Sequence, residues 1–285
     1  MIDLLDIRYV RLGTRDLANA IDFATRILGL QLVRQSADTA YFRSDDRDHT
    51  LCYFEGDPSD HTLAFELCDG QALEQAAAGL DAAGIRVHEG DTEACEKRLV
   101  QRFISLTDYS GNTIELVVRP QASGRRYFPS RDAGITGFSH VGLCSQDPLR
   151  DEKFWTEVFN ARVSDWIGAS PLLRIDEIHH KIALFPTQRS GIQHINHQVE
   201  SVDDIMRSWY FLQEAGVKVV FGPGRHPTSG ARFLYFEGPD GMVYEYSCGV
   251  SSIHDETSHR PRQFPATPEG FCMWGSKPDI AEFKS

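Results

Sequence analysis

The sequence predicts an α+β protein in which one βαβββ unit occurs four times, paired into two half-open barrels. Two stretches, "IRYVRLGTRDLANAIDFATRILGLQLV" and "FSHVGLCSQDPLRDEKFWTEVFNARV", share the plan of a strand followed by an amphipathic helix. Two others share a strand, a helix and an exit into a further strand through "AGIRV" or "AGVKV". The recurrence of one plan along a chain is the signature of an internal repeat. The four units span roughly 5–55, 60–118, 137–187 and 193–248.

The first and third units show the pattern most clearly. In the first unit, a strand in "IRYVRL" precedes a helical spacing of apolar residues over about 15–28, and Gly29 marks the end of the predicted helix. In the third unit, we expect a strand over 138–144 and a helix over about 148–159. The same order of elements in both units supports the repeat.

A segment without periodicity divides the chain. Residues 119–136, "RPQASGRRYFPSRDAGIT", carry Pro, Gly and Ser between the second and third units and are expected to form a linker. We therefore predict a two-module N-terminal domain over 1–118 and a two-module C-terminal domain over 137–249. Residues 250–285 contain four prolines and little pattern, so we expect this tail to wrap the surface.

The composition excludes several classes of function. The chain has 285 residues, 41% of them hydrophobic and 25% charged, which is typical of a soluble globular protein. The net charge of -12 should repel nucleic acid and anionic membranes. No apolar run has the length of a transmembrane helix, and the N-terminus lacks the features of a signal peptide. The six cysteines form no CxxC pair, so we expect reduced thiols and a cytoplasmic location.

Two strands that are expected to be buried each carry a carboxylate. Glu245 lies among aromatic residues in "VYEYS", four residues after Gly241, and Glu115 lies four residues after Gly111. A buried carboxylate is costly unless it is paired or binds a metal. A bound metal ion would therefore explain the acid in a strand rich in Tyr and Val.

Aligning the two halves on their repeats gives a candidate metal site. Eight of the eleven histidines lie after residue 139. Two neutral imidazoles and one carboxylate on one face of a divalent metal leave the opposite positions open for a substrate and oxygen. The aligned residues are His140, His197 and Glu245 in the second half and Tyr9, His61 and Glu115 in the first. We predict a duplicated metal site that is kept in the C-terminal domain and decayed in the N-terminal domain, where Tyr9 replaces a histidine.

The residues alone leave other interpretations open. A single histidine on a strand is more often an ordinary core or surface residue than a metal ligand. His179 and His180 are adjacent, so they face opposite sides of a strand and only one of them lines a pocket. His194 and His197 are three residues apart and also face opposite sides, and the context "NHQVE" favours His197.

These residues resemble those of the vicinal oxygen chelate superfamily and, within it, the type I extradiol ring-cleavage dioxygenases, which act on 2,3-dihydroxybiphenyl or catechol. The closing signature of that family is a histidine, a tyrosine nine residues later and a glutamate ten residues after the tyrosine. His226, Tyr235 and Glu245 reproduce this spacing around the "PDG" turn. The "HH-x-[IVL]-[AG]" strand of the family is matched by "HHKIA", which supplies His180. The resemblance covers about residues 5–249.

The resemblance implies a fold and an activity. The fold is that of the glyoxalase/bleomycin-resistance/dioxygenase proteins, and members are usually homo-oligomers. His140, His197 and Glu245 would bind Fe(II), with Mn(II) as the less common alternative. With O2 as co-substrate, the enzyme would open a catecholic ring to a muconic semialdehyde-type product during aromatic degradation. Tyr235 and His226 would hold the deprotonated hydroxyl group of the substrate, and His180 would take and return a proton.

Other functions within the superfamily remain as alternatives. A glyoxalase-like isomerase or a metal-dependent thiol transferase would use a similar fold, but such sites usually lack the set of His180, His226 and Tyr235. Binding proteins of the bleomycin-sequestering kind lose the metal ligands. The "PTSG" segment that follows His226 differs from the biphenyl-type enzymes, so the identity of the catechol stays open.

Overall fold

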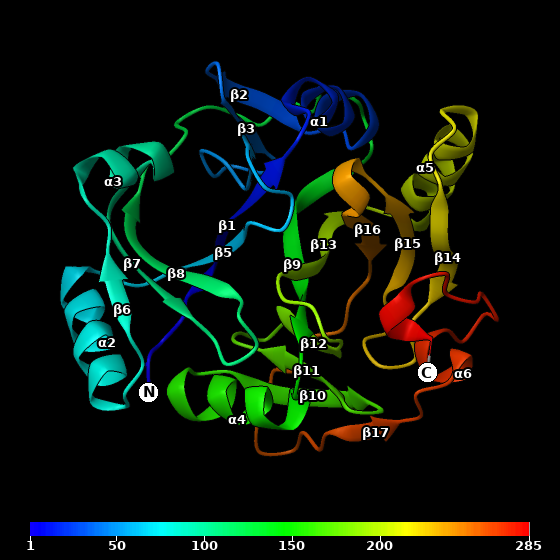
Figure 1. Cartoon of the computed structure of the whole chain (residues 1–285). Coiled ribbons are helices and arrows are strands. Elements are labelled where there is room, and N and C mark those ends of the chain that lie inside the picture. Colours follow the sequence, from blue (N-terminus) through cyan, green and yellow to red (C-terminus); the bar gives the residue numbers. More distant parts are fainter. Residues whose placement is uncertain (285) are drawn as a thin grey trace.

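The computed structural model describes residues 1–284 and contains two curved mixed sheets that lie side by side (Figure 1). The first half of the chain forms an eight-stranded sheet in the order β2-β3-β4-β1-β5-β8-β7-β6. The second half forms a nine-stranded sheet in the order β14-β15-β16-β13-β9-β12-β11-β10-β17. Each sheet consists of two βαβββ modules, which confirms the predicted fold class.

The elements of the first sheet follow the predicted repeat. Its first module contains β1 (Asp6–Thr14), α1 (Leu17–Asp22), the π-helical turn η1 (Phe23–Ile27), β2 (Gln31–Gln35), β3 (Thr39–Arg43) and β4 (Leu51–Glu55). Its second module contains β5 (His61–Glu66), α2 (Gly70–Ala82), β6 (Val87–Glu89), α3 (Thr92–Arg98), β7 (Val100–Thr107) and β8 (Thr113–Pro120). The modules meet where β1 and β5 pair antiparallel.

The second sheet repeats this order and adds the tail. Its first module contains β9 (Ile135–Ser145), α4 (Pro148–Val158), β10 (Arg162–Ile167), β11 (Ser170–Arg174) and β12 (Ile182–Pro186). Its second module contains β13 (Ile192–Val199), α5 (Val202–Glu214), β14 (Val219–Arg225), β15 (Arg232–Glu237), the 3-10 turn η2 (Pro239–Gly241) and β16 (Val243–Cys248). The tail contains β17 (Arg262–Phe264), α6 (Pro268–Phe271) and the 3-10 turn η3 (Ala281–Phe283).

Local signals explain where the helices begin and end. The side chain of Asp16 accepts a hydrogen bond from Asn19 N and caps α1, and Gly29 follows the helical segment with a φ of +78°. At α5, Ser201 and Asp204 form a reciprocal capping box. These short-range contacts account for the agreement between the predicted and observed helices.

The two sheets share one apolar core. Phe23, which follows α1, lies 5.4 Å from the ring of Tyr244 on β16, and Trp155 on α4 lies 5.6 Å from the ring of Phe65 on β5. A helix of each half therefore packs against strands of the other half. None of the helices within residues 1–284 is both long and apolar enough to span a bilayer.

Two parts of the chain differ from expectation. The short helix α3 is not evident in the sequence because its seven residues, "TEACEKR", show no apolar face; the side chain of Asp91 caps it. The tail was expected only to wrap the surface, but β17 pairs parallel with β10. Phe271 and Phe283 of the tail are each 4% exposed and belong to an apolar cluster of the second sheet. The tail is therefore part of the packed structure beside the second sheet.

Candidate metal centre

Within residues 1–284, one group of three potential metal ligands converges, and it lies on the inner face of the second sheet. It consists of His140 on β9, His194 on β13 and Glu245 on β16, and all three side chains are buried. His140 Nε2 lies 3.1 Å from His194 Nε2 and 3.1 Å from Glu245 Oε2. His194 Nε2 lies 3.5 Å from the same carboxylate oxygen. The three strands are neighbours in the sheet, so the ladder itself sets the spacing of these atoms.

The group fits a divalent cation. Three ligands that bind one face of an octahedral ion at about 2.1 Å are about 3 Å apart, which matches the observed separations. Both oxygens of Glu245 are buried and accept no well-formed hydrogen bond within the described structure. Burial lowers the pKa of His140 to about 4, so this imidazole is neutral at neutral pH. Burial opposes the charge on Glu245, but the His140 imidazole beside it holds the pKa of that carboxyl well below its usual value. Neutral imidazole and ionised carboxylate are the protonation states that metal ligands require.

The ring of His194 occupies a place that a glycine leaves open. Residue Gly142 is paired with His194 across β9 and β13, and a Cβ at that position would lie 2.4 Å from His194 Nδ1. Gln193 Oε1 accepts a hydrogen bond from His194 Nδ1, so the Nε2 lone pair of His194 faces His140 and Glu245. The backbone and Gln193 thus orient this histidine toward the candidate ligands.

The substitution Gly142→Ala tests this arrangement. The added methyl group must push the His194 ring away, so we expect the affinity for Fe(II) to fall at least about tenfold. The matched control is Gly137→Ala on the same strand, where the nearest atom to an added Cβ is 3.6 Å away. Metal content after desalting and a competition titration measure the effect. Equal affinities for the two variants would contradict the proposed role of Gly142.

His197 is not part of the cluster, which corrects the sequence prediction. The ring of His197 is fully buried and packs edge-on against Phe138 at 5.5 Å, and neither of its nitrogens has a hydrogen-bond partner in the described structure. Burial lowers its pKa to about 3, so it is a neutral core ring. The parallel register places Asn196 opposite Glu245, and side chains alternate along β13, so His194 and not His197 shares the face of the carboxylate.

The register also corrects the alignment of the first half. In the first half, Ala64 is paired with Glu115, just as Asn196 is paired with Glu245 in the second half. The residues two positions earlier are Thr62 and His194. Thr62, and not His61, therefore corresponds to His194. His61 lies one position away and accepts a hydrogen bond from Ile192 N at 3.0 Å. Of the three candidate ligand positions, the first half thus keeps only the glutamate.

In the first half, an arginine compensates the charge of the buried glutamate. Arg98 Nη2 and Nε lie 2.6 and 2.8 Å from Glu115 Oε1, and the Tyr9 hydroxyl donates to Glu115 Oε2 at 2.7 Å. Glu115 is 1% exposed. Burial, with the carboxylate beside it, raises the pKa of Tyr9 well above its usual value, so the phenol remains a donor. In the N-terminal half, the countercharge of the buried glutamate is thus a guanidinium group.

We expect Arg98→Ala to destabilise the protein by about 3–5 kcal/mol, because it leaves a buried carboxylate without a countercharge. The double variant Arg98→Ala/Glu115→Gln removes the charge as well and should recover part of the loss. Denaturant unfolding measures both variants, and the iron content should match that of the wild type. A loss below about 1 kcal/mol for the single variant would argue against this role.

Three further predicted site residues lie beside the cluster. The ring of His180 is 4.2 Å from that of His140, measured between centroids. His226 Nε2 lies 3.2 Å from the Tyr235 hydroxyl and 3.6 Å from Glu245 Oε1. Burial, together with the charge of Glu245, raises the pKa of Tyr235 well above its usual value. The Tyr235 hydroxyl is therefore protonated and can donate a hydrogen bond to a bound anion.

Hydrogen bonds that the sequence did not reveal set the tautomer of His180. His179 Nε2 lies 2.9 Å from Asp165 Oδ2, so this nitrogen donates, because a carboxylate only accepts. In the neutral ring, His179 Nδ1 then accepts from His180 Nδ1 at 3.1 Å. Burial, with the rings of His140 and His179 nearby, holds the pKa of His180 well below its usual value. His180 is therefore a neutral imidazole with an unprotonated Nε2.

A contact from the tail orients His226 in a similar way. The carbonyl of Phe271 accepts a hydrogen bond from His226 Nδ1 at 2.8 Å. The other ring nitrogen, Nε2, faces the Tyr235 hydroxyl. No sequence pattern indicates this contact, because 45 residues separate the two partners.

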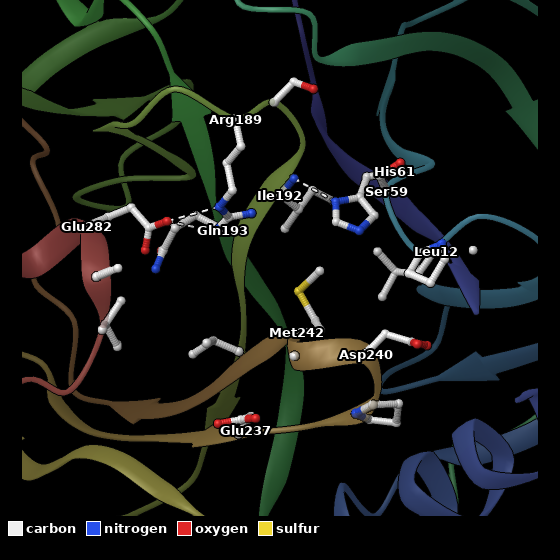
Figure 2. Close-up of a pocket in the computed structure, with 18 of the residues that line it drawn as sticks. Leu12, Ser59, His61, Arg189, Ile192, Gln193, Glu237, Asp240, Met242 and Glu282 are labelled. Atoms are coloured by element: carbon white, nitrogen blue, oxygen red, sulfur yellow. Dashed lines mark hydrogen bonds and ion pairs between the residues drawn. The ribbon is translucent and has the colours of Figure 1, made fainter. Parts of the chain in front are cut away.

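Two cavities are relevant to the site: one at the histidines and one farther out, between the two halves. The inner one has a volume of about 20 Å³ and is lined by the histidines of the site, by Tyr235 and by apolar side chains. The outer one has a volume of about 770 Å³ and lies between the two halves of the chain (Figure 2). In the outer cavity, Arg189 and Glu282 form an ion pair, and His61 contacts Ile192.

Comparison with known proteins identifies similar families and folds. The family model of the Glyoxalase/Bleomycin resistance protein/Dioxygenase superfamily matches residues 6–116 and 137–246. An iron-dependent extradiol dioxygenase of Rhodococcus jostii is 26% identical over 278 residues, which cover 90% of this chain and 93% of that protein. A Mn(II)-bound glyoxalase from Novosphingobium aromaticivorans is similar in structure, with a TM-score of 0.86 and 25% identity over 99% of this chain and 94% of that one. A halotolerant catechol dioxygenase has a TM-score of 0.88 and 23% identity over 99% and 98% of the respective chains, which shows the same fold.

Proposed function

Because this chain belongs to the Glyoxalase/Bleomycin resistance protein/Dioxygenase superfamily, we propose that it is an extradiol dioxygenase, which opens a catecholic ring beside its hydroxyl groups with Fe(II) and O2. The observation that carries the proposal is the cluster of His140, His194 and Glu245 with three acid–base groups around it. The iron-dependent extradiol dioxygenase of Rhodococcus jostii, which aligns with most of this chain, supports the same chemistry.

The three clustered side chains would hold the iron. His140 and His194 would supply imidazole nitrogens and Glu245 a carboxylate, which is the facial set typical of non-haem Fe(II) oxygenases. Iron held there would supply a site at which a catechol and dioxygen meet and exchange electrons. Mn(II) would suit the same ligands, and a metal-dependent relative in the superfamily carries it.

The surrounding residues bind the substrate and move its proton. The Tyr235 hydroxyl donates a hydrogen bond to the deprotonated oxygen of the catechol, and His226, oriented by the carbonyl of Phe271, lies beside the same oxygen. His180 accepts a proton at its free Nε2 and returns it during ring opening. The hydrogen bonds from Asp165 through His179 keep His180 in the tautomer that this step needs.

A metal-dependent isomerase of the glyoxalase kind is the second candidate. The similarity to the Mn(II)-bound glyoxalase favours it. Such an enzyme moves a proton within its substrate and consumes no oxygen, so the two candidates differ in a property that is simple to measure.

The experiment is anaerobic reconstitution with Fe(II), followed by the addition of catechols and dioxygen. The panel contains catechol, 3-methylcatechol, 4-methylcatechol, 2,3-dihydroxybiphenyl and carboxylated catechols. An extradiol dioxygenase consumes one O2 per ring opened and forms a yellow product that carries both atoms of isotopically labelled dioxygen. Iron bound without oxygen uptake for any catechol, but with isomerisation of a thiol adduct of a 2-oxoaldehyde, would favour the second candidate.

A further inference from the structure

The inner cavity is narrow, with a volume of about 20 Å³. The side chains that line it therefore decide which substituents a substrate ring bound beside His140 and His194 could carry.

Part of the wall lies on the sheet. Leu172, Ala183 and Phe185 lie on β11 and β12, and Tyr235 lies on β15, where the paired backbones fix the positions of their Cα atoms.

Phe271 and Phe283 of the tail form another part of the wall. The ring of Phe283 lies 4.7 Å from that of Phe185, 6.0 Å from that of Tyr235 and 6.4 Å from that of His194, measured between centroids. It also stacks on Phe271 at 4.8 Å. An aromatic side chain thus occupies the space next to the ligands, where the ring and the substituent of a substrate would need room.

The segment that carries Phe283 separates the two cavities. Ala281 and Glu282 of η3 line the outer cavity, whereas Phe283 lines the inner one. Glu282 is held by Arg189 at 2.9 Å, and Arg189 is about half exposed (Figure 2). The ion pair and the η3 turn thus position Phe283 as a part of the wall that no strand ladder sets.

The chemistry of the cavity restricts the substituent. Apart from Thr228 and the groups of the site, its lining is apolar, and no Lys or Arg among the described residues lines it. A carboxylate on the substrate ring would be buried without a countercharge, which is costly. A small alkyl group would instead pack among the apolar side chains.

We propose that Phe283 is a specificity-determining residue, whose ring forms the wall that faces the substituent of the substrate. The site accordingly takes monocyclic catechols with a small apolar substituent and disfavours both carboxylated and bicyclic ones. This inference rests on the proposed extradiol activity. It adds the substrate class and the part of the chain that selects it.

The test compares Phe283→Ala with the wild type on 3-methylcatechol, 2,3-dihydroxybiphenyl and 3,4-dihydroxyphenylacetate. For the iron-loaded wild type, we expect kcat/KM for 3-methylcatechol to exceed that for 2,3-dihydroxybiphenyl at least about tenfold. Removing the ring should raise the relative kcat/KM for the bicyclic substrate about tenfold, with a parallel change in the anaerobic Kd measured by calorimetry. The carboxylated catechol should remain poor for both proteins.

The matched control is Trp274→Ala, because Trp274 lies in the same tail and is 57% exposed. This variant should leave the ratios of kcat/KM among the three substrates unchanged. If Phe283→Ala does not fold, Phe283→Leu keeps an apolar side chain in the cluster and serves the same comparison. Three results would overturn the inference. The kcat/KM ratios of the folded Phe283 variant could stay within twofold of the wild type, or the Trp274 variant could change them equally. The wild type could also prefer the carboxylated catechol. Failure of every catechol to bind or react with the iron-loaded wild type would instead refute the proposed function.

Discussion

His194→Ala is expected to lower the affinity for Fe(II) at least about a hundredfold and to abolish ring cleavage. Loss of a group that only supports a ligand already costs about 10–100-fold in metal affinity, so loss of a ligand costs at least as much. The imidazole of His194 contributes one of the three atoms that converge within 3.1–3.5 Å. Metal content after anaerobic desalting, followed by competition with a chelator of known affinity, gives the change directly.

The matched control for this substitution is His197→Ala. His197 lies three residues away on the same strand and is equally buried, but it packs against Phe138 on the other face of the sheet. We expect this variant to lose about 1–3 kcal/mol of stability from the cavity it creates and to keep stoichiometric iron. Loss of iron from the His197 variant together with retention in the His194 variant would reverse the assignment.

His180→Ala is expected to lower kcat by about 10²–10⁴-fold while iron binding stays intact. The reason is that His180 offers an unprotonated Nε2 beside the ligands but contributes no atom to the converging group. Single-turnover measurements on the iron-loaded variant, with substrate bound anaerobically before oxygen is added, separate the chemical step from binding.

The first half of the chain supplies the control for His180. The pairing of β1 with β4 and of β9 with β12 places His49 at the position that corresponds to His180. His49 is 1% exposed and lies between the rings of Tyr9 and Tyr41. His49→Ala should therefore leave both the iron content and the turnover close to the wild type. A similar loss of turnover in both variants would show that the effect is structural.

The repeat made the architecture predictable from the sequence. Each βαβββ unit carries local signals, such as the cap of α1 by Asp16 and the glycine after it, and these signals occur in both halves. The candidate residues His140, Tyr235 and Glu245 lie on strands whose order follows from the repeat, and His180 and His226 lie beside the ends of two further strands. The structure places their side chains around one point of the second sheet.

The choice between His194 and His197 could not be made from the sequence, because it depends on register. The ladder between β9 and β13 shifts at several points, and each shift changes which side chains share a face. The correct face is evident only once Asn196 is seen opposite Glu245. A short motif such as "NHQVE" contains no information on that pairing.

Contacts between distant parts of the chain were also outside the reach of the sequence. Arg98 reaches Glu115 from a short helix without an apolar face, and Phe283 reaches the inner cavity from a tail without periodicity. Neither residue belongs to a repeated pattern. Arg98 affects the electrostatics of one buried site, and Phe283 affects the shape of another. Both contacts depend on tertiary structure alone.

A crystal structure of the protein loaded anaerobically with Fe(II), with an anomalous difference map recorded at the iron edge, would locate the metal directly. We expect one strong peak within about 2.5 Å of His140 Nε2, His194 Nε2 and a carboxylate oxygen of Glu245. We expect no peak beside Glu115, where Arg98 supplies the countercharge. A peak bound by His197, a peak in the first half, or no bound iron at all would show that these three residues do not form the iron site.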